Sequence, residues 1–220
     1  MHTGTTPFPA IMDRLAKSRL ICVAVIDRAD DAVPLAESLL AGGIEFIEVT
    51  FRTAEAVEAL RRIRESVPAI CAGAGTLLTP DDARRAADAG AQFAVAPGLD
   101  EAVLATTREI SLPFFPGVMT PTELSRALRL GCSHLKFFPS AASGGAAMLK
   151  AVAGPFLHTG VKFIPTGGIT AETLPDYLAI PQVLAVGGMW MADRALLAEK
   201  AWGKITALAA QAVDIAATTK

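Results

Sequence analysis

Short apolar runs alternate with longer amphipathic segments along the chain, and this alternation limits the possible folds more than any other feature. Continuous apolar runs bounded by turn residues are typical of strands buried on both faces, whereas apolar residues spaced three and four apart are typical of helices. The strand pattern is met at residues 20–26, 44–50, 69–75, 93–96, 113–116, 134–138, 161–165 and 183–186. The helical pattern is met between and after these runs, at residues 31–41, 54–66, 80–89, 101–109, 121–130, 146–153, 171–179 and 193–213.

Strictly alternating strands and helices predict a parallel sheet covered by helices. Eight such units within 220 residues favour closure of the sheet into a (β/α)₈ (TIM) barrel, with one further helix at 9–17 before the first strand. An open, doubly wound sheet is the alternative fold. No linker or low-complexity tract divides the chain, so we expect a single domain over residues 1–220.

The ends of the predicted helices carry recognisable signals. Thr79 precedes Pro80, and Thr120 precedes Pro121 with Glu123 three residues further on, as in a capping box. The glycines Gly42, Gly43, Gly90 and Gly131 follow helical segments, where a residue with positive φ commonly ends a helix. These signals support the positions predicted for the helices.

The composition excludes some classes of partner. The formal net charge is −2, which gives no indication of binding to nucleic acid or to an anionic membrane. The apolar run at 20–26 is too short to span a bilayer. Hydrophobic residues make up 52% of the chain, which suggests that some surface is hidden in an oligomer. The cysteines Cys22, Cys71 and Cys132 are far apart, which predicts reduced, buried thiols in a cytoplasmic protein.

Lys136 is the most unusual residue in a predicted strand. Lysine is almost never fully buried unless it is paired. Burial disfavours the charged form of an amine, and a neutral amine is what attacks a carbonyl to form a Schiff base. Phe137 and Phe138 are expected to keep water away from it. A purely structural ion pair with Glu48 is the alternative role for this lysine.

Polar residues cluster at other strand ends, which is where the active site of a barrel lies. Alternation along the strand predicts that Glu48, Thr50 and Arg52 share one face, which would place a general acid/base beside an anion anchor. A structural Glu48–Arg52 pair at the rim is the alternative. Thr76 follows the Gly73–Gly75 strand end and is placed to donate its hydroxyl to a carboxylate.

Two Gly-Gly pairs follow the last two predicted strands, at Gly167-Gly168 after Thr166 and at Gly187-Gly188. Barrels of this kind often bind phosphate at these ends through backbone N–H groups and a helix N-terminus. Tight turns without a ligand are the alternative explanation.

Other candidates are weaker. Lys162 lies at the start of its strand, at the opposite end of a barrel, and His134 lies one layer below Lys136 as a core histidine. A metal-dependent aldolase needs a cluster of His and carboxylate ligands, which the three histidines do not suggest, so no metal is expected. An isomerase barrel that binds phosphate would leave Lys136 unexplained. The complete set of Glu48, Arg52, Thr76 and Lys136 argues against a barrel that binds a sugar phosphate without converting it.

Taken together, these residues resemble the 2-keto-3-deoxy-6-phosphogluconate / 2-keto-4-hydroxyglutarate aldolases, the class I pyruvate aldolases of the Entner–Doudoroff route. The resemblance extends from about Leu20 to Ala210. The matching stretches are 41–53, 73–76, 94–98, 115–117, 135–140, 153–156, 165–169 and 186–188.

The resemblance implies a role for each matching residue. Lys136 corresponds to the Schiff-base lysine and Glu48 to the general acid/base. The other implied roles are carboxylate binding by Arg52 and Thr76, phosphate binding by Thr166, Gly167, Gly168, Gly187 and Gly188, and pocket lining by Pro97 and Phe138. It further implies a small keto-deoxy sugar acid as substrate, no cofactor or metal, and a homotrimer.

One position departs from the family pattern. Members commonly have a serine after the last Gly-Gly, where its hydroxyl helps to bind phosphate, but this chain has Met189. A thioether cannot donate that hydrogen bond. The expected substrates are therefore 2-keto-3-deoxy-6-phosphogluconate or, alternatively, a phosphogalactonate, a 4-hydroxy-2-oxoglutarate or an unphosphorylated analogue.

Overall fold

The computed structural model describes residues 8–219. All strand pairs are parallel, as the sequence predicts for strands joined through helices. The strands are β1 (Leu20–Ala24), β2 (Phe46–Thr50), β3 (Cys71–Gly75), β4 (Ala94–Val95), β5 (Phe114–Phe115), β6 (Gly117–Val118), β7 (His134–Phe137), β8 (Lys162–Pro165) and β9 (Val186–Gly188).

The strands form two sections of curled parallel sheet. One is a 6-stranded sheet in the order β5-β4-β3-β2-β1-β9, and the other is a 3-stranded sheet in the order β6-β7-β8. Single bridges between Phe163 and Val183 and between Thr166 and Gly187 connect the two sections. The run predicted at 113–116 corresponds to β5, and β6 begins directly after Pro116, which has no N–H for a ladder.

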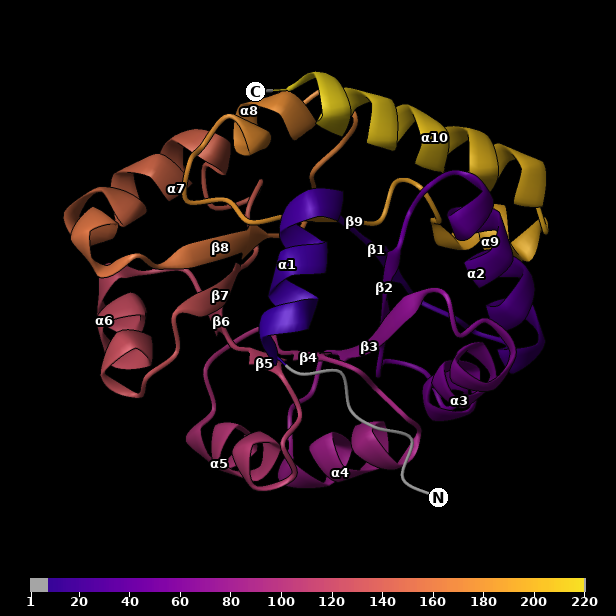
Figure 1. Ribbon diagram of the computed structural model, residues 1–220, viewed down its shortest axis with the longest axis horizontal. Coiled ribbons are helices and arrows are strands. Elements are labelled where there is room, and N and C mark those ends of the chain that lie inside the picture. The colour runs from indigo at the N-terminus through magenta and orange to yellow at the C-terminus, as the bar shows by residue number, and fades with distance from the viewer. Residues whose placement is uncertain (1–7, 220) are drawn as a thin grey trace.

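Helices surround the strands, with the first helix across one end and the others on the outside (Figure 1). They are α1 (Phe8–Ser18), α2 (Ala32–Ala41), α3 (Ala56–Ser66), α4 (Pro80–Asp88), α5 (Glu101–Glu109), α6 (Pro121–Arg129), α7 (Gly145–Ala153), α8 (Leu174–Leu178), α9 (Arg194–Ala198) and α10 (Trp202–Thr218), with 3₁₀ turns at Ala29–Asp31 and Gly154–Thr159. The prediction of a single helix over 193–213 was wrong, because Lys200 has a φ of +52° and separates α9 from α10.

The predicted helix-end signals are confirmed except at Gly42. Thr79 and Thr120 each form a capping box, with Asp82 and Glu123 respectively. Gly43, Gly90 and Gly131 have positive φ, whereas Gly42 does not.

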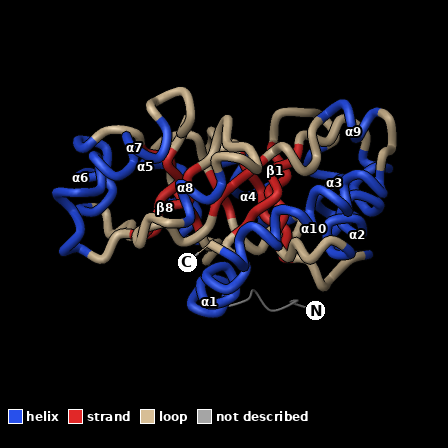
Figure 2. The backbone as a smooth tube through the Cα atoms, turned by 90° about the horizontal axis from the view of Figure 1, so that it is seen from above, coloured by secondary structure: helices blue, strands red, loops and turns tan. Residues whose placement is uncertain are grey.

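Helix α1 lies across one end of the strands (Figures 1 and 2). Its buried residues Ile11, Met12 and Leu15 pack into an interior apolar cluster formed with strand residues such as Phe46 and Phe115. A second, larger cluster lies between the strands and the surrounding helices. The end covered by α1 is therefore dry and well packed, and the opposite end carries the loops that follow the strands. Among the described residues, no helix is long and apolar enough to span a membrane.

Arg19, between α1 and β1, joins three distant carbonyl groups. Its guanidinium donates to the backbone oxygen of Leu178 at 2.7 Å, and to those of Ala216 at 3.1 Å and Thr219 at 2.6 Å. The last carbonyls of a helix have no partner within the helix, so Arg19 satisfies acceptors at the ends of α8 and α10.

We predict that Arg19→Met lowers the free energy of unfolding by about 2 kcal/mol, since hydrogen bonds from a charged donor are lost while the apolar stem is kept. Urea unfolding measures this change. Arg126→Met is the control, because Arg126 forms an exposed ion pair with Glu101 and should change stability much less. Equal effects of the two substitutions would contradict the role given to Arg19.

Candidate active site

A buried ion pair lies at the centre of the candidate site. Lys136 on β7 places its Nζ 3.1 Å from Oε1 and 3.4 Å from Oε2 of Glu48 on β2. Lys136 is 5% exposed and Glu48 is 2% exposed. Among the ion pairs of the described residues, this is the one with both side chains buried. Each charge compensates the other, because neither could remain ionised there alone without a large desolvation cost.

One aromatic ring, rather than two, lies beside the amine. The Nζ of Lys136 is 5.5 Å from the centroid of the Phe138 ring, on the same side of the strand. Phe137 faces the opposite way and packs edge-on against Phe163 in the outer cluster. The expectation that both phenylalanines line the pocket was therefore wrong for Phe137.

The residues expected to bind a carboxylate lie at adjacent strand ends. Strand β2 ends at Thr50, so Arg52 lies in the following turn and not on the strand face with Glu48. Its side chain is exposed, and it is absent from the ion pairs of the described residues. Thr76 directly follows β3 and has a φ of +61°, a strained conformation for a β-branched residue. The N–H of Phe51 donates to the oxygen of Gly75 at 2.7 Å, which brings these two turns together.

The first Gly-Gly pair lies next to the end of β7. Gly167 and Gly168 have φ values of +100° and +72°, which glycine adopts without steric cost. The N–H groups of Ser140 and Ala141 donate to the oxygens of Thr166 and Gly167 at 2.8 and 2.9 Å. The loop that follows Lys136 is therefore tied to the candidate phosphate loop.

The second Gly-Gly pair ends β9. A β-carbon at Gly187 would lie 2.5 Å from the hydroxyl oxygen of Thr166, and one at Gly188 would lie 1.7 Å from the ring of Trp190. Met189 follows and is 37% exposed. No described helix begins directly at either pair, since α8 starts at Leu174 and α9 at Arg194. The expected helix N-terminus is thus not part of this arrangement.

The rival titratable residues lie elsewhere, as expected. Lys162 begins β8, and its Nζ donates to the oxygen of Pro181 at 2.9 Å. His134 begins β7 and is half-buried, and burial, with a smaller contribution from Lys162, lowers its pKa. The three cysteines are free and buried, which confirms the predicted thiols. Burial, together with the Glu48 charge, raises the pKa of Cys22 to about 12, so this thiol is not a nucleophile at neutral pH.

Sequence reasoning missed the contact between Ser140 and Tyr177. Both side chains are buried, and the Ser140 hydroxyl donates to the Tyr177 oxygen at 3.0 Å. It links the loop after β7 to α8. No spacing in the sequence indicates this pair, because the two residues belong to different units of the chain.

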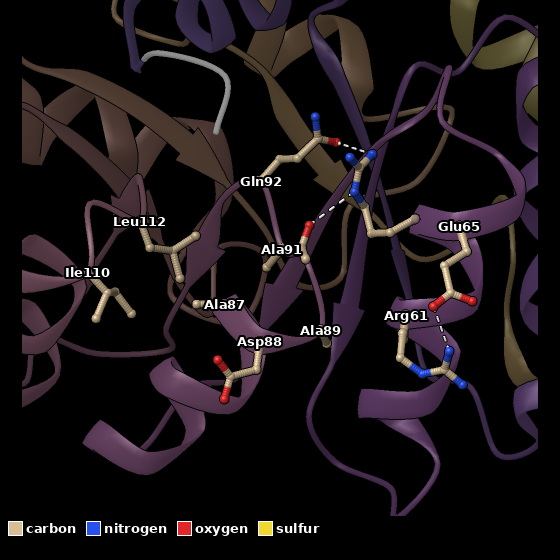
Figure 3. Close-up of a pocket in the computed structure, with 11 residues that line it drawn as sticks. Arg61, Glu65, Ala87, Asp88, Ala89, Ala91, Gln92, Ile110 and Leu112 are labelled. Atoms are coloured by element: carbon tan, nitrogen blue, oxygen red, sulfur yellow. Dashed lines mark hydrogen bonds and ion pairs between the residues drawn. The ribbon is translucent and has the colours of Figure 1, made fainter. Parts of the chain in front are cut away.

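A cavity of about 490 Å³ lies away from this constellation. Figure 3 shows its lining, which comes from α3, from the end of α4 and the segment that follows it, and from the segment after α5. Arg61 there pairs with Glu58 and Glu65, and Arg64 donates to the oxygen of Gly90. None of the candidate site residues contributes to this cavity. The described residues contain no group of three or more His, Cys, Asp or Glu side chains placed to hold a metal.

A lysine paired with a carboxylate inside a parallel α/β sheet, at the ends where the strand loops gather, defines a class of enzyme whose lysine is placed to attack a carbonyl. Comparison with known proteins identifies the family. The model of the KDPG and KHG aldolase family matches residues 11–208, and the chain belongs to this family. The predicted class of enzyme, a carbon–carbon lyase of the aldolase type, is confirmed by this membership.

Three relatives illustrate the similarity. The chain is 44% identical to the 2-dehydro-3-deoxy-phosphogluconate aldolase of Treponema pallidum, over 93% of this chain and 97% of that protein. It is 42% identical to the KHG/KDPG aldolase of Escherichia coli K12, over 91% and 93% of the two chains. A solved structure of KDPG aldolase from Legionella pneumophila, with pyruvate captured at low pH as a covalent carbinolamine intermediate, has a TM-score of 0.87 and 41% identity, and covers 94% of this chain and 98% of that one.

The buried pair leads to a prediction about stability. Lys136→Met leaves Glu48 buried without a partner and should lower the free energy of unfolding by about 3–5 kcal/mol. Adding Glu48→Leu should recover most of this loss, because neither charge is then buried. Urea unfolding of the two single variants and the double variant tests the coupling, and strictly additive losses would contradict it.

Proposed function

We propose that this chain is a class I aldolase that cleaves 2-keto-3-deoxy-6-phosphogluconate to pyruvate and glyceraldehyde 3-phosphate. The observation that carries the proposal is the 3.1 Å contact between the buried Lys136 amine and the Glu48 carboxylate. The relatives named above support the substrate, because all three carry this activity in their names and one of them was captured with pyruvate bound covalently.

Glu48 first accepts a proton from Lys136, and the neutral amine attacks the C2 carbonyl of the substrate. Glu48 then returns a proton to the oxygen of the carbinolamine, which leaves as water and gives a protonated imine. Contact at 3.1 Å permits the transfer from Lys136 to Glu48 without a relay.

Bond cleavage follows from the same pair. Glu48, or a water that it positions, removes the proton from the C4 hydroxyl. The C3–C4 bond breaks, its electron pair moves into the imine to give an enamine, and the aldehyde leaves. Protonation at C3 and hydrolysis of the imine release pyruvate and regenerate the amine of Lys136.

The remaining site residues are assigned to binding. Arg52 and Thr76 hold the pyruvyl carboxylate, which orients the reacting carbonyl toward Lys136. Thr166, Gly167, Gly168, Gly187 and Gly188 hold the distal phosphate through backbone N–H groups, and Pro97 and Phe138 line the space between the two ends.

We extend the proposal to the architecture. The two sheet sections and the bridges Phe163–Val183 and Thr166–Gly187 support a closed (β/α)₈ barrel in one domain, with α1 across its lower end. The apolar composition and the family support a homotrimer, and unpaired thiols support a cytoplasmic enzyme. No cofactor or metal enters the proposed reaction.

The Schiff base can be trapped directly. Incubation with pyruvate and borohydride should add one reduced pyruvyl group to Lys136, and peptide mass spectrometry locates it. Lys136→Ala should abolish the adduct and the aldolase activity, whereas the control Lys162→Ala should retain both. No adduct, or an adduct on Lys162, would refute the proposed function.

Met189 decides how strongly phosphate is preferred. A hydrogen bond to a charged group contributes about 1.5–3 kcal/mol, so Met189→Ser should raise kcat/KM for the phosphorylated substrate about tenfold. The unphosphorylated keto-deoxy acid should show little change and serves as the internal control. An equal gain on both substrates would contradict phosphate binding at this position, and a wild-type preference for the unphosphorylated acid or for 4-hydroxy-2-oxoglutarate would favour those alternatives.

A further inference from the structure

Gly75, the last residue of β3, lies against the carboxylate of Glu48. A β-carbon at position 75 would be 2.1 Å from Oε1 of Glu48 and 2.6 Å from its Cδ and Cγ atoms. Non-bonded carbon and oxygen atoms do not approach this closely, so any larger residue at position 75 must displace the carboxylate.

The need for glycine here is one of space and not of backbone conformation. Gly75 lies in a regular strand, where its Cα is the partner of Thr50, and its φ lies outside the left-handed region. Alanine can therefore adopt the backbone conformation of Gly75 without strain, and the three atoms nearest to its β-carbon would all belong to Glu48. Gly73 on the same strand differs, because a β-carbon there would lie 2.5 Å from the ring of Phe93.

Two contacts fix the position of the Glu48 carboxylate. Lys136 binds it at 3.1 and 3.4 Å, and Gly75 limits it by close approach. Within the described residues, this carboxylate accepts hydrogen bonds from Lys136 alone. The ion pair is altered once the lysine nitrogen is bonded to C2 of the substrate, whereas the contact with Gly75 remains.

We propose that Gly75 is a positioning residue for the reaction, in that the space left by its missing side chain holds the Glu48 carboxylate at proton-transfer distance from the lysine nitrogen after the ammonium of Lys136 has become the nitrogen of a carbinolamine or imine. This inference rests on the proposed function. It predicts that filling this space slows the proton transfers made by Glu48 and leaves the groups that bind the substrate in place.

The test compares Gly75→Ala in two backgrounds. With Glu48 present, Gly75→Ala should lower kcat for aldol cleavage at least tenfold and change KM less than threefold. It should lower the rate of exchange of pyruvate methyl protons with solvent deuterium, followed by NMR, to a similar extent. With Glu48→Asp, whose shorter side chain withdraws the carboxylate from position 75, the further effect of Gly75→Ala should be less than twofold. An equal effect in both backgrounds, or none with Glu48 present, overturns the inference.

Two glycine variants serve as controls. Gly203→Ala in α10 meets no atom within 4 Å and should retain wild-type kcat. Gly73→Ala should lower the melting temperature through its clash with Phe93, and Glu48→Asp should not relieve that loss. If Glu48→Asp also restores the melting temperature lost by Gly73→Ala, then a general loosening of the protein, and not the space at position 75, explains the rescue. That result would overturn the inference.

Folding failure is also informative. If Gly75→Ala does not fold, the double variant with Glu48→Asp should fold and should have the same kcat as Glu48→Asp alone. If neither Gly75→Ala nor this double variant folds, the inference is overturned. The proposed function is judged separately from the wild-type protein. Absence of a pyruvate adduct at Lys136 removes that function and this inference with it, whereas an adduct with equal effects in both backgrounds removes only the inference.

Discussion

Two opposite charges buried at 3.1 Å from each other impose the main requirement on this fold. Lys136 belongs to the 3-stranded sheet section and Glu48 to the 6-stranded section, so their contact crosses the interior between the two. A buried pair offsets its desolvation cost only with good geometry, which demands that both strands be held firmly. The hydrogen-bonded ladders fix the strands, the outer helices cover them, and the apolar cluster beneath the pair excludes water.

The interior side chains are large at the end near α1 and small at the opposite end, where the strand loops lie. The layer nearest α1 contains Phe46, Phe93 and Phe115, whose rings lie in a chain with centroids 6.2 and 6.1 Å apart. Further along the strands, Gly75 and Gly187 leave space that is taken by Glu48 and Thr166. Large residues therefore provide stability at one end, while missing side chains give polar groups room at the other.

Much of the fold could be predicted from the sequence, because it depends on local patterns. Apolar runs located the strands, and Thr79 and Thr120 marked helix starts through contacts within one turn. Lys136 and Glu48 were predicted from the cost of burying them in strands, and they are in contact. Features that depend on backbone detail were not predictable: Arg52 lies beyond the end of β2, and Lys200 adopts a positive φ that ends α9.

Contacts between distant units were the hardest to foresee. The Ser140–Tyr177 hydrogen bond depends on how the loop after β7 meets α8, and the close approach of Gly75 to Glu48 depends on how β2 and β3 stagger. No spacing along the chain records either. In a sequence, a glycine within a strand indicates only that the strand is weakened there or that another group approaches its backbone closely. The sequence does not identify that group. The structure supplies that identity, and the glycine can then be assigned to the site.

The two ends of the site are mechanically linked through the loop that follows β7. Lys136 is four residues before Ser140, whose N–H bonds to the oxygen of Thr166, and Ala141 bonds in the same way to Gly167. The Phe138 ring lies between the two ends, because it faces the lysine amine on one side and would lie 3.1 Å from a β-carbon at Gly167 on the other. A group held at the glycine loop is thus kept at a set distance from the reactive nitrogen. In the proposed function, Met189 lies outside these hydrogen bonds, so the affinity for the distal phosphate can change there without moving the lysine, and different residues set the reaction and the choice of substrate.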